Sequence, residues 1–284
     1  MATHVQQHYV PKFVLEQWHT GPDSKLTAFR WAHGKLDAQR YKAKSVARMA
    51  HLYSLHRNDG HLDVALERDF LGPHVDDPAA LVHQAILKAG LTLTNEQQLT
   101  WAKFVVSLLV RGPGMIEHLR ALGREELTTS LEENPLDYEA VRGDAKEATL
   151  LEFVSARNAP LFENFGVQLL PQVLSREQFL GPLLAGKTWL VRPLKDAKHD
   201  LLIGDRPVIQ EGLITGEHVF TLPLSPHVLF AVCSSQQAAS RLGSMAPDEL
   251  VRRLNTATVR RAETHVFATS ARQEPLIRKW LVNP

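Results

Sequence analysis

Two short segments, almost 200 residues apart, place ionisable side chains beside prolines. His8 opens the segment His8–Phe13, and Asp205 and Arg206 directly precede Pro207. An imidazole can act as a general base or bind a metal near neutral pH, and a carboxylate can bind a metal ion, orient a histidine or activate water. The prolines restrict the local backbone and so fix where these side chains point. Such segments also form ordinary turns, so the pattern indicates candidate sites without naming a reaction.

Three further polar residues are candidates because of their surroundings. Arg111 follows a long apolar run, so its guanidinium is expected to be partly buried and to need an acceptor such as a carboxylate or phosphate. Glu67 belongs to the charged stretch Leu66–Asp69, whose side chains point in different directions from a helix. Asn255 lies within a predicted helix, where an amide can bridge to a neighbouring loop. Arg206 is a second candidate for an anion.

Each candidate also has a structural interpretation that the sequence leaves open. His8 would bond a backbone group and pin the N-terminal segment, and Asp205 would accept N–H groups in the turn before Pro207. Arg111 would form an ion pair with Glu67 or Asp205. Glu67 would lie on a solvated helix face.

Composition places the chain among ordinary globular proteins. It has 284 residues, of which 44% are apolar and 22% charged, and a formal net charge of +1. The even charge balance gives no overall attraction to nucleic acid or acidic lipid. Cys233 is the only cysteine, which excludes internal disulfides and thiol-rich zinc sites, and its apolar surroundings predict a buried, inert thiol.

Several familiar signatures are absent from the sequence. It contains no phosphate-binding P-loop, no Gly-x-Gly-x-x-Gly, no His-Glu-x-x-His and no Gly-x-Ser-x-Gly. It also has neither a secretory signal pattern nor an apolar run near the roughly 20 residues of a membrane span. We therefore expect a soluble, cytoplasmic protein without a membrane partner.

The order of elements predicts one α+β domain over residues 1–284. Residues 1–58 form a small β-containing segment, residues 62–166 are helical, and residues 167–284 are rich in strands. A capped helix is expected to begin at Thr94 and run to Arg111, where Gly112-Pro113-Gly114 ends it. Residues 44–55 are expected to include a short helix, and residues 125–144 an exposed polar insertion. The predicted architecture is a central helical bundle packed on a mixed, mostly antiparallel sheet built from the N- and C-terminal segments.

The motifs together resemble one family along nearly the whole chain. The segment His8–Leu15, the run Val110–Pro113, the segment Gly204–Val208 and the run Leu222–Pro226 are similar to the DUF4238 family, a mainly bacterial group of unknown function. Its members typically carry a serine before the aspartate of the third segment, where this chain has Gly204. The resemblance implies the extent of the fold and candidate positions but no reaction.

Two functional hypotheses follow from these residues. In the first, a bacterial hydrolase of nuclease or phosphodiesterase type uses His8, Glu67 and Asp205 around a divalent metal or an activated water, with Arg111 neutralising an anionic substrate. In the second, the same residues form a structural network in a non-catalytic module that binds a small anion, peptide or nucleic acid. Whether the protein is an enzyme stays open, as does the identity of any metal cofactor or phosphate-bearing partner. The arginine pairs at 252–253 and 260–261 are expected to form a solvated helix face.

Overall fold

The computed structural model describes residues 5–133, 138, 139, 141–212 and 217–283. The chain forms two compact units: unit 1 comprises Met1–Gln7, Met49–His74 and Pro113–Ser175, and unit 2 comprises His8–Arg48, Val75–Gly112 and Arg176–Pro284. Helices and antiparallel sheets both contribute to the chain, so the predicted α+β class is confirmed.

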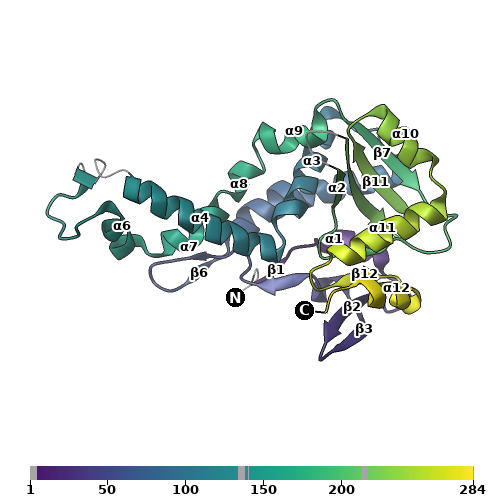
Figure 1. Cartoon of the computed structure of the whole chain (residues 1–284), viewed down its shortest axis with the longest axis horizontal. Coiled ribbons are helices and arrows are strands. Elements are labelled where there is room, and N and C mark those ends of the chain that lie inside the picture. Colours follow the sequence, from purple (N-terminus) through teal and green to yellow (C-terminus); the bar gives the residue numbers. More distant parts are fainter. Residues whose placement is uncertain (1–4, 134–137, 140, 213–216, 284) are drawn as a thin grey trace. The chain divides into compact units, whose positions relative to one another are not determined.

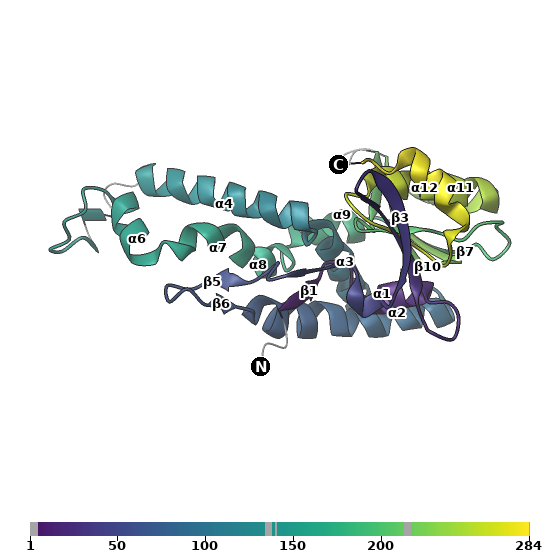
Figure 2. The ribbon, with the colours of Figure 1, turned by 90° about the horizontal axis from the view of Figure 1, so that it is seen from below.

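Unit 1 is built around two helices that lie side by side, α4 and α7 (Figures 1 and 2). Its remaining elements are short. The bounds are β1 (Gln6–His8), β4 (Arg48–Ala50), β5 (Leu55–His56), β6 (Leu62–Asp63), the π-helical segment η3 (Leu66–Asp76), α4 (Pro113–Glu133), α6 (Leu150–Asn158), α7 (Pro160–Gln168) and α8 (Leu170–Val173); β1, β4 and η3 contain points where the chain passes between units.

Two glycines allow the backbones of α4 and α7 to touch. A Cβ atom built on Gly166 would lie 1.8 Å from the carbonyl oxygen of Leu119, and one on Gly123 would lie 2.4 Å from the backbone nitrogen of Gly166. Because both neighbours are backbone atoms, rotation of a side chain cannot relieve such a clash. The glycines therefore set the distance between the two helices.

We expect Gly166→Ala to destabilise unit 1 by about 3 kcal/mol, the upper part of the usual range for overpacking. The measurement is urea denaturation followed by circular dichroism. Gly243→Ala is the control, since that glycine lies in a helix with open space around it and alanine there should stabilise by up to about 1 kcal/mol. A Gly166→Ala protein as stable as wild type would contradict the close approach.

Unit 2 contains two four-stranded antiparallel sheets, with strand orders β7-β11-β10-β9 and β3-β2-β12-β8. Helix α11 contributes side chains to the apolar clusters of both sheets. The elements are α1 (Lys12–Leu15), η1 (Glu16–Trp18), β2 (Leu26–Ala32), β3 (Lys35–Tyr41), η2 (Ala43–Ser45), α2 (Asp77–Ala89), α3 (Asn95–Val110), α9 (Glu177–Leu184), β7 (Thr188–Pro193), β8 (Ile203–Gly204), β9 (Ile209–Gly212), β10 (His218–Ser225), β11 (Val228–Cys233), α10 (Gln236–Ser244), α11 (Pro247–Arg261), β12 (Val266–Ala268), η4 (Ala271–Gln273) and α12 (Glu274–Trp280).

Alternation along β11 gives the first sheet two apolar faces. Phe230 points to one face and meets the ring of Trp101 from α3 edge-on, with centroids 5.8 Å apart. His83 of α2 stacks on Trp101 and lies 2.9 Å, through Nε2, from the carbonyl oxygen of Leu224. On the opposite face, Ala231 and its neighbours pack against α10 and α11. Helices thus cover both sides of this sheet.

The second sheet begins with a tight hairpin. The turn residues between β2 and β3, His33 and Gly34, both have positive φ angles, of 50° and 72°. A two-residue turn of this kind matches the twist of the flanking strands. Phe29, Val266 and other residues on one face of the sheet form a core with α11 and α12, which lie beside β12 in Figure 1. The other face carries the polar residues of the candidate site.

The sequence predicted some of these elements and missed others. The capping box between Thr94 and Gln97 is present, and α3 ends at Val110 before Pro113. The predicted helix within 44–55 is wrong, because Ala47 and His51 adopt left-handed backbone angles that interrupt any helix. The polar insertion expected from residue 125 is also wrong as far as Glu133: α4 continues there and buries Leu127. Residues 134–137 and 140 of that predicted insertion lie outside the described residues.

Two other expectations concern burial and membranes. Cys233 is buried, and burial raises the pKa of its thiol to about 11, as expected for an inert side chain.

Among the described residues, no single helix has both the length and the apolar character needed to cross a bilayer. The consecutive helices α3 and α4 meet these criteria of length and composition only when they are counted together.

Candidate functional site

Strand register places a row of polar residues across the second sheet of unit 2. Val266 of β12 pairs with Phe29 of β2 and with Gly204 of β8. Each pairing is antiparallel, so the preceding residue, His265, lies opposite Arg30 on one side and Asp205 on the other. Residues opposite each other on antiparallel strands share a face of the sheet. Arg30 in turn pairs with Asp37 of β3, which completes the row.

Asp205 holds the turn that connects α11 to β12. Its Oδ1 accepts from the backbone N–H of Glu263 at 2.9 Å, and its Oδ2 accepts from the N–H groups of Thr264 and His265 at 2.6 and 2.8 Å. The hydroxyl of Thr264 lies 2.8 Å from the same Oδ2. The side chain is buried, and hydrogen bonds from a charged carboxylate are among the stronger ones in proteins. Its first role is therefore structural.

The same carboxylate determines which nitrogen of His265 carries a proton. Thr264 Oγ1 lies 2.7 Å from His265 Nδ1. A carboxylate only accepts, so the single hydroxyl hydrogen of Thr264 goes to Asp205, and Oγ1 must accept from Nδ1–H. Neutral His265 then has its lone pair on Nε2. Burial, as the main cause, and the charge of Arg30 lower the pKa of His265, although Asp205 opposes them.

Tyr9 joins this network from the N-terminal segment. Its backbone N–H donates to the carbonyl of Ala47 at 3.0 Å, and its side chain is hydrogen-bonded to Thr264. Burial above all, and then the negative charge of Asp205, raise the pKa of the Tyr9 hydroxyl far above its usual value. Tyr9 therefore stays protonated and serves as a donor.

A small polar cavity of about 250 Å³ opens beside this row. The second sheet forms one wall, and the segment that follows η2 forms another. Within the described residues, no hydrogen bond or ion pair is found for the guanidinium groups of Arg30 and Arg48, and both side chains are exposed. The lining residues are Tyr9, Ala28, Arg30, Asp37, Tyr41, Ser45, Val46, Ala47, Arg48 and His265.

His8 and Arg111 lie in a basic neighbourhood of unit 2. Burial is the main reason that the pKa of His8 is lowered; Arg48, Arg111 and Lys12 lower it further, and a hydrogen bond to the Lys44 backbone opposes them. Arg111 is only 1% exposed, and its Nη1 donates to Asp76 Oδ1 at 2.8 Å. Asp76 is thus an ion-pair partner of Arg111 that the sequence did not suggest.

Glu67 and Arg206 occupy less enclosed positions. Glu67 is half-buried in the part of η3 that belongs to unit 1, whereas His8, Arg111 and Asp205 belong to unit 2. Arg206 is exposed and pairs with the carboxylate of Glu263. Across the described ranges, no three His, Cys, Asp or Glu side chains stand where they could share a metal ion.

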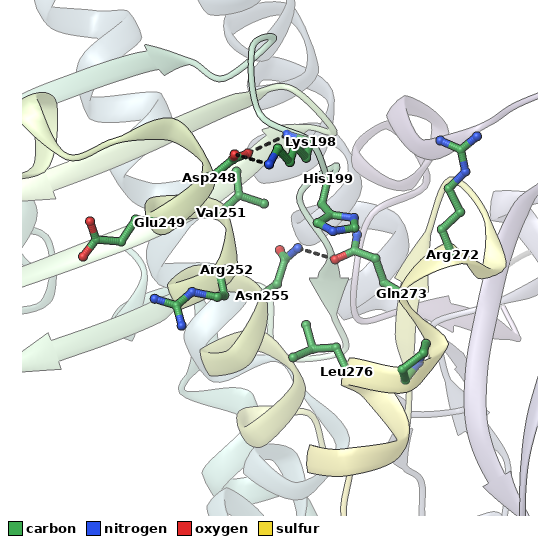
Figure 3. Close-up of a pocket in the computed structure, with 11 residues that line it drawn as sticks. Lys198, His199, Asp248, Glu249, Val251, Arg252, Asn255, Arg272, Gln273 and Leu276 are labelled. Atoms are coloured by element: carbon green, nitrogen blue, oxygen red, sulfur yellow. Dashed lines mark hydrogen bonds and ion pairs between the residues drawn. The ribbon is translucent and has the colours of Figure 1, made fainter.

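Asn255 lies in the wall of a second cavity, of about 640 Å³, between the segment 195–202, α11 and α12 (Figure 3). Its side chain is 1% exposed, and both of its polar atoms form hydrogen bonds. Oδ1 accepts from the N–H of Leu202 at 2.8 Å, while Nδ2 donates to the carbonyl of Asp200 at 2.9 Å and to Gln273 Oε1 at 2.7 Å. The amide clamps three segments together, as the bridging interpretation predicts.

The chain matches one known protein family over most of its length. Residues 6–272 match the model of DUF4238, described as a protein of unknown function. The chain belongs to the DUF4238 family. Neither the curated proteins nor the solved structures include a match to it.

Gly204 stands where members of the DUF4238 family typically carry a serine, and a side chain at this position would face away from the polar cavity. A Cβ atom at Gly204 would point to α11, 3.4 Å from Thr258 Cγ2 and 3.6 Å from the Cβ of Ala262. The next side chain, Asp205, reaches the turn and the polar row. A serine hydroxyl at position 204 would therefore face the helix and leave the cavity of this family member unchanged.

Sequence reasoning missed the residues that line the cavity. Tyr9 was within the N-terminal motif, but Arg30, Arg48 and His265 carried no motif of their own. The residues Leu26–Trp31 alternate in the manner of a strand, and β2 occupies this segment. The pairing of that strand with residues 266–268 depends on contacts more than 230 residues apart and leaves no local signal.

We expect Asp205→Ala to destabilise the protein by about 2–4 kcal/mol, because several donors of the 263–265 turn lose a charged acceptor at once. Urea denaturation measures the effect. Arg206→Ala is the matched control, because it removes only an exposed ion pair, worth at most about 1 kcal/mol. Equal, small losses in both variants would contradict the structural role of Asp205.

Proposed function

We propose that the protein binds a small phosphate ester in the cavity lined by Arg30, Arg48 and His265. The observation that carries the proposal is the combination of two exposed arginines and one histidine on a single small polar cavity. Guanidinium groups match phosphate oxygens in geometry and charge, and they form charge-assisted hydrogen bonds with them.

The other polar groups of the cavity favour an ester over free phosphate. The carboxylate of Asp37 can accept a hydrogen bond from a hydroxyl group on the organic part of an ester. Tyr41 supplies a further hydroxyl at the opposite end of β3. A hydroxyl-bearing ester such as glycerol 3-phosphate satisfies both the arginines and Asp37.

We expect glycerol 3-phosphate to bind the wild-type protein and to bind R30Q/R48Q at least tenfold more weakly. The two lost arginine–phosphate interactions need to contribute only about 1.4 kcal/mol together to change the affinity tenfold. Isothermal titration calorimetry measures both affinities. The control K35Q/K42Q removes two positive charges at the ends of β3, outside the cavity lining. The same loss in both double variants, or no binding to wild type, would refute the site.

Hydrolysis of the bound ester is the second candidate function, favoured by the hydrogen-bond chain from Asp205 through Thr264 to His265. In such a reaction, water attacks phosphorus while His265 Nε2 takes its proton, and the P–O ester bond breaks. The leaving alkoxide receives the proton from the imidazolium, giving alcohol and phosphate. This assigns the role of base to His265 in place of His8.

A metal-dependent version with His8, Glu67 and Asp205 would need Asp205 to give up hydrogen bonds that it makes to the turn. Those bonds favour the metal-independent route. The hydrolysis assay therefore includes conditions with Mg²⁺, with Mn²⁺ and with a chelator.

For hydrolysis, we expect His265→Gln to reduce turnover of p-nitrophenyl phosphate by about 100-fold, the usual size of a general-base contribution. A base must be neutral, and the pKa of His265 is lowered, so the wild-type rate should stay level down to about pH 6.5 and fall only below it. Tight binding of glycerol 3-phosphate without any turnover would reject hydrolysis and leave the binding function standing.

A further inference from the structure

The cavity described above at Asn255 combines apolar walls with a charged rim. The first turn of α12, with Pro275 and Leu276, supplies apolar surface, and the buried Val251 of α11 borders the cavity. At about 640 Å³, the cavity has the size and the mostly apolar lining of a small-molecule site. It shares no lining residue with the polar cavity at His265.

The polar floor of this cavity is already satisfied. Asn255 makes three hydrogen bonds, and Gln273 Nε2 donates to the carbonyl of Asp200 at 2.8 Å. Figure 3 shows the side chains of Asn255 and Gln273 pointing toward each other, with His199 beside Gln273. A ligand here would therefore gain its affinity from the apolar walls and the rim.

The rim carries one more positive than negative charge. Lys198, Arg252 and Arg272 are cationic, whereas Asp248 and Glu249 are anionic. Lys198 and Asp248 pair with each other at 3.9 Å. Arg252 and Arg272 stand at opposite edges in Figure 3, and within the described ranges no acceptor is found for either guanidinium group.

We propose that this cavity binds an organic monoanion with an apolar body, such as an aromatic carboxylate. The apolar body lies against Pro275 and Leu276, and the carboxylate meets an arginine at the rim. Burial of apolar area supplies the larger share of affinity, and the charge selects for acids over neutral analogues.

Neighbouring arginines do not extend this rim into a surface for a polyanion. Arg253 pairs with Glu211, and Arg261 donates to the carbonyl of Gln210. Arg260 lies over the ring of Trp280, 3.7 Å from its centroid. With these three engaged, the observations favour a small acid over nucleic acid.

The experiment compares 1-naphthoate with its neutral analogue 1-naphthalenemethanol by isothermal titration calorimetry. We expect wild type to bind the carboxylate about tenfold more tightly than the alcohol, and R252Q/R272Q to lose that preference, because two exposed charge interactions together contribute about a factor of ten. Leu276→Ser should weaken both ligands by a similar factor, since it removes apolar wall and leaves the charges in place.

The control R253Q/R278Q also removes two positive charges, one from α11 and one from α12. It alters no residue of the cavity lining. It should bind naphthoate as wild type does. Circular dichroism establishes that each variant is folded. Equal affinity of wild type for the acid and the alcohol, equal losses in both double variants, or no binding at all would overturn the proposal. Arg30 and Arg48 do not line this cavity, so the two binding proposals are tested independently of each other.

Discussion

The arrangement of unit 2 depends on one carboxylate at the turn between α11 and β12. Asp205 accepts hydrogen bonds from three successive residues of that turn, and its own N–H donates to the carbonyl of His265. These contacts join β8 to β12 where the chain leaves the helix. A charged acceptor with several donors resists replacement by water more strongly than a single neutral bond does. The position of α11 over the second sheet and the row of polar residues across that sheet follow from this turn.

The antiparallel strand register makes the positions of the cavity residues depend on this turn. With β12 fixed beside β8, its pairing with β2 brings His265 opposite Arg30, and the hairpin places Asp37 at the end of the row. Side chains alternate along each strand, so the residues that build the apolar core on one face leave polar residues on the other. A shift by one residue would exchange the two faces. Packing of Phe29 and Val266 against the helices therefore also determines the chemistry of the cavity.

The polar residues of this chain divide between those that hold the fold together and those exposed on cavity walls. Asn255 and Asp205 are buried, with hydrogen bonds at every acceptor, and Arg111 is buried against Asp76. Burying charged or amide groups costs free energy unless such partners are present. Arg30, Arg48, Arg252 and Arg272 are exposed on cavity walls instead. The first set explains why the segments meet, and the second set provides the charges on which both proposed binding sites rest.

The sequence by itself determined the α+β class, the capped helix from Thr94, the strand at Leu26–Trp31 and the burial of Cys233, because periodicity, capping and turn residues act over a few neighbours. It also identified Asp205, Asn255 and Arg111 as residues with demanding environments. Only the tertiary structure decided the partners of these residues: Asp76 for Arg111, the 263–265 turn for Asp205, and two separate segments, 200–202 and η4, for Asn255. It likewise brought His265 and Arg30 together. Such pairings join residues far apart in the chain, and they follow from how apolar faces pack, which no local pattern records.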